Sequence, residues 1–386
     1  MRHANPAMVA PSVLNWALER ATVSRSDLAA AVGTSATVVE EWLGGNRQPS
    51  FRQARAAATR LRIPFGFLFL AEPPPEDLPI PDFRTVDGHR LRAISVDLRD
   101  VLLATMRKQA WLSEQLREGG ADPVAVVGRA EGASSSSAVA TDIRRTLRLP
   151  TGHQRPVSAD EFMRDIVQRV ERIGVNVLRS GVVGNNTSRP LKIDEFRGFT
   201  LSDQYAPFIF VNSVDARQAQ IFTLIHELTH IWRGDSGISG GLEQTSLSVE
   251  RFANRVAADV LVPPDEFRRE WLERVPPRDA IRTASQHFRI SRYVIAIRAF
   301  ESGFIPRDVL DDLLAEYRAE GLRPRATTSS GGDYYKTLIA RNGKSFTEGV
   351  VDAVGRQRVL VRDAAGLLDA KPGQLPRISR EIRGAG

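Results

Sequence analysis

The sequence contains no cysteine among its 386 residues. Disulfide bonds and thiolate metal sites are therefore excluded, and a zinc ion would have to be held by histidine and carboxylate side chains. The chain is 42% hydrophobic and 26% charged, an ordinary balance for globular domains, and it is long enough for two or three of them.

Long apolar runs are also missing. The stretch MRHANPAMVAPSVLNWALER has no unbroken apolar segment after its basic residue, and no window approaches the roughly 18 apolar residues of a membrane span. We therefore predict a soluble, cytoplasmic protein with no membrane partner.

The net charge of +7 is concentrated at the two ends of the chain. Residues 323 to 386 hold twelve Lys and Arg against six Asp and Glu, and residues 1 to 72 hold eight Arg against five acids. Basic ends suit nucleic acid or an acidic partner, and the alternative is a solvated basic surface.

Residues 12 to 70 predict a compact helical unit. Ser24 or Ser26 and Ser50 are expected N-caps, and Gly33 and the turn at 44–46 are expected helix stops. The stretch LAAAVGTSATVVEEWLGGNRQPS resembles the repressor-type (XRE-like) helix-turn-helix family. Its core positions would be Leu28, Val32, Val38 and Trp42, followed by the signature G-x-R-x-P at Gly45, Arg47 and Pro49.

This resemblance implies that the helix at 35–43 enters the major groove of an operator. Base contacts would come from Thr34, Ser35, Thr37 and Gln48, and phosphate contacts from Arg47 and Arg52. The helix has no Arg or Lys and carries two glutamates, so we expect weak or cooperative binding, helped by a homodimer. The alternative is a helical bundle used only for dimerisation or partner contact.

The remaining chain predicts an α+β, mostly helical protein. After a proline-rich linker at 73–84, residues 85–160 read as a helical connecting region. Short β-rich pieces, VNVL, RGFTL and APFIFVN, then lead into a helix, which predicts a further domain at 161–322 with a small sheet. Residues 323–386 form a basic C-terminal region.

The stretch FTLIHELTHIWRG at 222–234 combines a helical apolar stripe with a polar cluster on the opposite side. His226 and His230 lie one turn apart and can address one ion, and Glu227 would lie beside the attacking water. The alternative is a helix with two solvent-facing histidines.

A catalytic zinc site needs a third protein ligand. The helix predicted at 248–262 carries Glu250, followed on the same face by small residues that allow close packing against the HExxH helix. A glutamate early in a helix also complements the helix dipole, so that role remains an alternative.

Together, FTLIHELTHIWRG and VERFANRVAADVLVPP, preceded by RGFTL and APFIFVN, resemble the ImmA/IrrE family of HExxH metallopeptidases. The resemblance covers roughly residues 160 to 300, and with the N-terminal helices the chain resembles the longer members of that family. It implies a zincin-like fold, Zn²⁺ held by His226, His230 and Glu250, and Glu227 as general base. The segment Arg197, Gly198, Phe199 and Thr200 could pair with an extended substrate by strand addition.

Family members cleave repressor-type helix-turn-helix proteins, so the resemblance implies such a protein as substrate. Other long members resemble antitoxins encoded beside toxins such as PIN-domain ribonucleases. A DNA-binding autoregulator or antitoxin that uses the peptidase fold as a docking surface is therefore the second hypothesis. No oxyanion-stabilising residue can be chosen from the candidates Arg197, His287, Tyr293, Tyr334 and Tyr335, and His287 is interpreted as structural.

Overall fold

The computed structural model describes residues 6–74, 95–239, 247–321 and 333–384. They are mostly helical with a small sheet, which confirms the predicted α+β class. The chain divides into two compact units, Met1–Asp100 and Val101–Gly386. Most of the predicted linker at 73–84 lies outside the described residues. No helix in the described ranges combines the length and apolar content needed to cross a bilayer.

The first unit is a small bundle around one apolar core. Its elements are α1 (Pro11–Ala21), α2 (Arg25–Val32), α3 (Ala36–Leu43), α4 (Phe51–Leu61) and η1 (Phe65–Phe69). Ser24, Ser35 and Ser50 cap α2, α3 and α4 through their side chains, and Gly33 ends α2 in the left-handed conformation. Only Gly33 to Ser35 separate α2 from α3.

The core of this unit differs from the prediction at one position. Leu28, Val32 and Trp42 are buried, but Val38 is only partly buried and its neighbour Val39 is fully buried. Val38 and Val39 precede Trp42 by four and three residues, so both lie on the core side of α3; Val39 is buried in the core and Val38 packs against it.

The second unit is built around a four-stranded sheet with the order β1-β5-β4-β6. The strands are β1 (Asn176–Ser180), β4 (Gly198–Leu201), β5 (Phe208–Asn212) and β6 (Gly237–Ser239), and β2 (Val182–Val183) and β3 (Asn186–Pro190) form a separate pair. β1 runs parallel to β5, whereas β4 is antiparallel to both β5 and β6.

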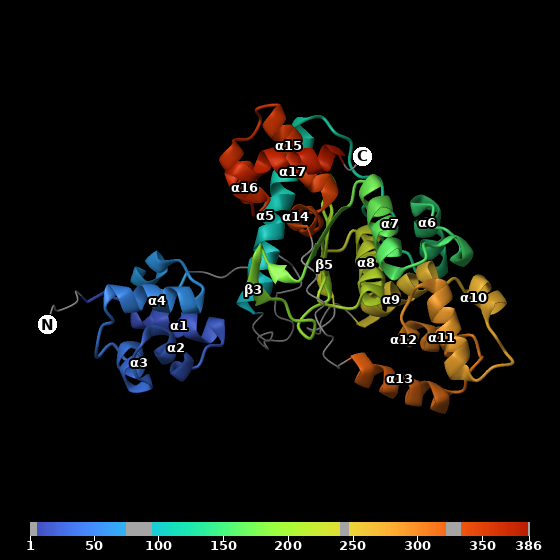
Figure 1. The fold of residues 1–386 in the computed structure, drawn as a ribbon, viewed down its shortest axis with the longest axis horizontal. Coiled ribbons are helices and arrows are strands. Elements are labelled where there is room, and N and C mark those ends of the chain that lie inside the picture. Colours follow the sequence, from blue (N-terminus) through green and yellow to red (C-terminus); the bar gives the residue numbers. More distant parts are fainter. Residues whose placement is uncertain (1–5, 75–94, 240–246, 322–332, 385–386) are drawn as a thin grey trace. The chain divides into compact units, whose positions relative to one another are not determined.

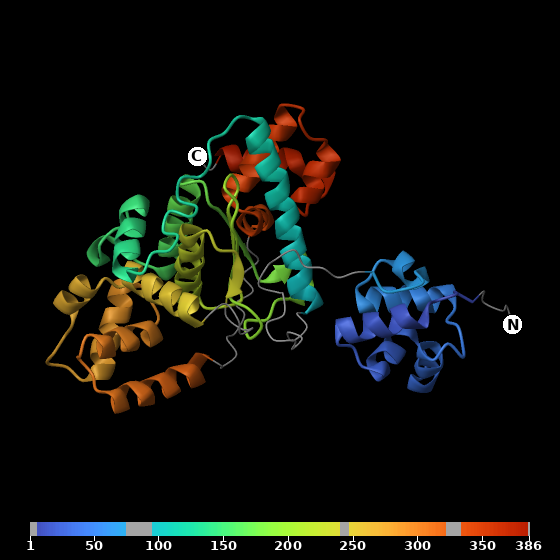
Figure 2. The same cartoon turned by 180° about the vertical axis from the view of Figure 1, so that it is seen from behind.

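Helices cover both faces of this sheet (Figures 1 and 2). One side carries α7 (Ala159–Arg172), α8 (Arg217–Arg233) and α9 (Leu247–Leu261), and the other carries α5 (Val96–Glu118) and the C-terminal helices. The C-terminal helices are α14 (Tyr334–Asn342), α15 (Lys344–Gly355), α16 (Val361–Leu367) and α17 (Leu375–Gly384), with η4 (Pro372–Gln374) before α17. The remaining elements of the unit are α6 (Ser136–Leu147), η3 (Gly152–Gln154), α10 (Pro264–Glu270), α11 (Pro277–Phe288), α12 (Arg292–Glu301) and α13 (Arg307–Gly321).

The pleat of the strands divides the apolar residues between these two layers. Ile209 and Val211 of β5 join the core cluster with the apolar residues of α7, α8 and α9. Phe210 faces the other layer, where it stacks on Phe199 at 5.0 Å between ring centroids. Phe208 meets Phe346 of α15 on that same side, at 5.6 Å.

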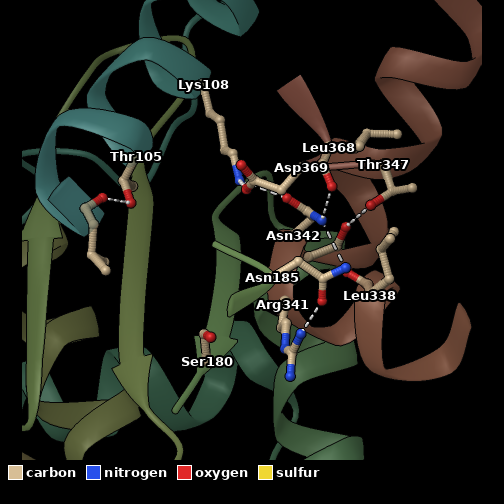
Figure 3. A network of polar contacts seen from close by, with 12 residues as sticks. Thr105, Lys108, Ser180, Asn185, Leu338, Arg341, Asn342, Thr347, Leu368 and Asp369 are labelled. Atoms are coloured by element: carbon tan, nitrogen blue, oxygen red, sulfur yellow. Dashed lines mark hydrogen bonds and ion pairs between the residues drawn. The ribbon is translucent and has the colours of Figure 1, made fainter. Parts of the chain in front are cut away.

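A polar network joins the C-terminal helices to α5 (Figure 3). The buried Lys108 donates from Nζ to Oδ1 of Asn342 at 2.6 Å and to Oδ2 of Asp369 at 3.0 Å. Asn342 in turn donates to the carbonyl oxygens of Leu338 and Leu368. The described part of the basic C-terminal region is therefore a set of helices packed against the sheet layer.

Glu171, near the end of α7, provides a pH-dependent contact to the same helices. Its carboxyl accepts hydrogen bonds from the backbone amides of Lys344 and Ser345 at the start of α15. Burial raises the pKa of Glu171 from 4.5 to about 7, although the two amides act in the opposite direction.

The raised pKa predicts that the folded protein loses stability as the pH rises, because ionisation of the buried carboxyl costs more than the two amides recover. Glu171 binds its proton more tightly in the folded state, so its contribution is fully present below pH 4.5 and is lost as the pH passes about 7. Relative to Glu171→Gln, the wild type should lose about 2–3 kcal/mol of unfolding free energy between pH 5 and pH 8. Urea unfolding of both proteins at the two pH values measures this difference, and parallel pH profiles would contradict it.

Candidate metal centre

Helix α8 carries the HExxH residues into the core of the second unit. Every residue from Gln220 to Trp232 is buried except Phe222, and the helix ends at Gly234 in the left-handed conformation. One side of the helix packs into the main core through Ile221, Leu224, Ile225, Leu228 and Trp232. His226 is 5% exposed, Glu227 0% and His230 4%. The alternative of two solvent-facing histidines is therefore excluded.

The structure places Glu250 beside both histidines. Its Oε2 lies 3.1 Å from Nε2 of His226 and its Oε1 lies 3.4 Å from Nε2 of His230. The two Nε2 atoms are 3.2 Å apart. One ligand atom from each of these three residues therefore lies within 4.8 Å of the others, so the group can hold a metal ion.

Small side chains on α9 allow this approach. Ala253 and Ala257 are fully buried, and α9 packs along α8. Glu250 lies in the first turn of α9, as the sequence predicts, but its carboxylate is directed at the histidines. It therefore does more than complement the helix dipole.

The environment keeps Glu250 in its ionised form. Burial of the carboxyl acts to raise its pKa, but hydrogen bonds and charge from His226 and His230 outweigh this and lower the pKa well below its ordinary value. An ionised carboxylate is the form that ligates metal ions.

Asn254 orients one of the histidines. Its Oδ1 lies 3.1 Å from Nδ1 of His226, and because an amide oxygen only accepts, Nδ1 carries the proton. Nε2, which faces Glu250 and His230, is then the ring nitrogen that can ligate a metal ion once it has released its proton. Asn254 was not among the predicted site residues, and its position four residues after Glu250, on the same face of the helix, is the signal that could have indicated its role.

The prediction that residues 197–200 pair with an extended substrate needs correction, because both edges of strand β4 are already paired within the sheet. β6 already pairs along the open side of β4, with Gly198 opposite Ser239, Phe199 opposite Ile238 and Thr200 opposite Gly237. The backbone of this segment therefore has no vacant edge for strand addition. The side chain of Arg197 forms an ion pair with Asp215.

The residues of β4 instead contact α8. Thr200 donates from Oγ1 to Oε2 of Glu227 at 2.8 Å. A Cβ atom at Gly198 would lie 2.7 Å from Cγ2 of Thr223 and 2.9 Å from Oε1 of Glu227, so only glycine allows this close approach. Sequence reasoning chose the right strand but assigned it the wrong contact.

None of the oxyanion candidates belongs to the His226, His230 and Glu250 group. Tyr334 and Tyr335 lie on α14, where Tyr334 bonds with Asn185 and Tyr335 stacks on Arg377. Nε2 of His287 lies 3.8 Å from Oε1 of Glu266, and its Nδ1 lies 3.9 Å from Oε2 of Glu270. The interpretation of His287 as a structural residue stays a prediction. Tyr293 is part of α12.

In the first unit, the predicted DNA-contacting residues divide into two groups. Ser35, Thr37, Arg47 and Arg52 are exposed, and Thr34 is half-buried. Gln48, by contrast, receives a hydrogen bond from the backbone amide of Val9 at 2.9 Å, so its side chain secures the N-terminal segment. Each glutamate of α3 pairs with an arginine, Glu40 with Arg25 and Glu41 with Arg47.

Two histidines one turn apart on a buried helix, a carboxylate from a second helix and an adjacent glutamate define a site of the metallopeptidase type. Comparison with known families gives the same class, because residues 170–300 match the family model of the IrrE N-terminal-like domain, Peptidase_M78. This match supports the resemblance to the ImmA/IrrE family over the part of the chain that contains β4, α8 and α9. No curated protein matches the chain.

Proposed function

We propose that the protein is a zinc-dependent endopeptidase. The observation that carries this proposal is the convergence of His226, His230 and Glu250 at separations of 3.1 to 3.4 Å. A tetrahedral zinc ion with ligands at about 2.0–2.1 Å needs those ligands about 3.3 Å apart. The three side chains therefore fit zinc, and the chain has no cysteine that would favour a softer site.

When bound, zinc would lower the pKa of the attacking water and polarise the scissile carbonyl group. Proton transfer during cleavage would be carried out by a side chain of the protein. Glu227 would accept the proton of the attacking water on its carboxylate and then deliver it to the leaving amine. Burial of Glu227 within the core excludes bulk water, which strengthens the electrostatic effect of its charge.

The proposed substrate is a repressor-type regulatory protein bound to DNA. This part of the proposal rests on the family match at residues 170–300 together with the α2–α3 pair of the first unit, which has the short turn of a helix-turn-helix. The first unit would bring the peptidase to an operator, where its substrate is bound.

The test compares the wild type with Glu227→Gln in the native host. New protein N-termini and co-purifying proteins are identified by mass spectrometry. A repressor-type protein that is cut only by the wild type and retained by the variant supports the proposal and names the substrate. If neither protein produces a new terminus and both retain the same uncut partner, the peptidase proposal is wrong.

A DNA-binding regulator or antitoxin is the second candidate function. The observation in its favour is the exposed position of Thr37 on α3, of Arg47 in the turn after it and of Arg52 in the first turn of α4. The ion pairs that engage Glu40 and Glu41 are exposed, and such pairs are weak enough to rearrange beside phosphates. In this case the peptidase fold would serve as a docking surface for a partner such as a toxin.

DNA binding of this kind predicts a specific salt effect. Arg52→Ala in the full chain should lower the slope of log K against log salt by about 1, because one phosphate contact is lost. Fluorescence anisotropy with a duplex from the promoter of the chain's own gene measures this slope. Arg60→Ala, which removes an exposed arginine near the other end of α4, should leave the slope unchanged.

A further inference from the structure

Thr200 is a fully buried polar residue in the middle of the sheet. Its backbone is paired on both sides, with Ile209 of β5 and with Gly237 of β6. The pleat directs the side chains of alternate residues to opposite faces, so Thr200 faces α8 while Phe199 faces Phe210 and the other layer.

The hydroxyl group of Thr200 reaches Glu227 at two points. Oγ1 lies 2.8 Å from the carboxylate Oε2 and 3.0 Å from the backbone carbonyl oxygen of the same residue, and its single proton is shared between these two acceptors, of which the carboxylate oxygen is the nearer. A hydrogen bond to an ionised acceptor is roughly twice as strong as a neutral one, and burial strengthens it further.

We propose that Thr200 is the positioning residue of the general base, a role that rests on the peptidase function proposed above. Glutamate has three rotatable side-chain bonds, whereas threonine is branched at Cβ and restricted at χ1. A hydroxyl on a strand paired on both sides is therefore a fixed point from which the Glu227 carboxylate is held.

Gly198 contributes to the same arrangement from the next position on that face of β4. Its missing side chain lets the strand come close to Thr223 and to Oε1 of Glu227. The two residues of β4 that face α8 thus have separate effects: Gly198 permits the close approach, and Thr200 uses it to bond the carboxylate.

The competing explanation is that the hydroxyl only stabilises a buried carboxylate in the fold. Thr200→Val removes the hydroxyl at almost constant volume, and Thr200→Ser keeps it. A positioning role predicts that Thr200→Val lowers kcat about 10- to 100-fold with KM and bound zinc unchanged, in line with the loss of one hydrogen bond to a charged group. Thr200→Ser should restore most of the rate.

The control is Thr347→Val on α15. Thr347 is also fully buried, and its hydroxyl donates a hydrogen bond to the backbone carbonyl oxygen of Gly343 at 2.6 Å. This variant loses an equivalent hydroxyl away from Glu227, so it should lower stability without changing kcat. The substrate for all assays is the protein retained by Glu227→Gln in the host, with labelled casein as a second probe.

A measurement without zinc tests the contact itself. In the zinc-free protein, Thr200→Val should lower the melting temperature more in the wild type than in a Glu227→Leu background, since leucine leaves no carboxylate to bond. Equal shifts in both backgrounds would mean that Thr200 and Glu227 are not coupled, and the proposal would be wrong.

The outcomes separate this inference from the proposed function. If the wild type cleaves its substrate and Thr200→Val keeps the full kcat, only the positioning role is overturned. The positioning role is also overturned if Thr200→Val loses zinc or raises KM in proportion to its loss of rate. If the wild type and Glu227→Gln are equally inactive, the peptidase function is overturned and the positioning role falls with it, whatever the melting temperatures show.

Discussion

Glu227→Gln should lower the rate of peptide cleavage by about 10²- to 10⁴-fold, which is the usual contribution of a general base. Glutamine has the size of glutamate and can still accept the hydrogen bond from Thr200, but it cannot take a proton from water. His226, His230 and Glu250 are untouched, so the zinc content should stay at the wild-type level.

This result is measured by following cleavage and metal content on the same preparations of the full chain. Glu171→Gln is the matched control, because it exchanges another largely buried carboxylate, at the contact with α15 and outside the metal group. The control should keep its activity near neutral pH. Full activity of Glu227→Gln would contradict the assignment of Glu227 as the base.

Glu250→Ala should abolish stoichiometric zinc binding. The substitution removes the third proposed ligand and leaves only the two histidines, which are too few for a stable tetrahedral site. Loss of a supporting residue around a zinc site already costs about 10- to 100-fold in affinity, so loss of a ligand should cost at least about 100-fold. Cleavage should be lost together with the metal.

The measurement is the zinc content per chain after dialysis, together with the rise in melting temperature on adding zinc. A ligand that binds only the folded state raises that temperature, so the wild type should respond and Glu250→Ala should not. Glu301→Ala is the control, because Glu301 has a side-chain exposure of 28% against 26% for Glu250 but pairs with Arg255. One zinc ion per chain in Glu250→Ala would exclude the proposed ligand set.

The composition of the site supports a functional origin. Burying His226, Glu227 and His230 in a packed unit, with Glu250 partly buried beside them, costs free energy, because these polar groups lose contact with water. An apolar core would be more stable, and the surrounding apolar residues of α8 offset the cost. A destabilising group of this kind is expected at a catalytic or binding site.

The sequence predicted the site best where the interacting residues are close together along the chain. His226 and His230 are separated by one helical turn, so their convergence follows from the period of an α-helix alone. The apolar stripe of α8 predicted its docked face for the same reason, and every residue of that stripe lies in the core. Glu250 was predicted less directly, because its approach depends on how α9 packs against α8.

Contacts between strands were harder to predict. The segment RGFTL is recognisable as a strand, but its pairing partners lie at 208–211 on one side and 237–239 on the other. Gly237 to Ser239 form a strand of only three residues, too short for an alternating pattern to indicate it. The occupied edge of β4 could therefore be recognised only in the folded chain.

The C-terminal region illustrates a similar limit. Its excess of positive charge is visible in the sequence, whereas its docking on the sheet depends on Phe346 meeting Phe208 and on Lys108 meeting Asn342 and Asp369. These partners are more than 100 residues apart in the chain. No local pattern connects them.

Residue types at fixed spacings were enough to predict the candidate metal site, an HExxH helix with a carboxylate within reach in a chain without cysteine, and a capped helical unit at the N-terminus. Helical geometry converts such spacings directly into positions. The folded chain was needed to establish that both histidines are buried, that β6 closes the edge of β4, and that Thr200 bonds the carboxylate of Glu227. Those features depend on strand order and on packing between distant segments, which no single stretch of sequence specifies.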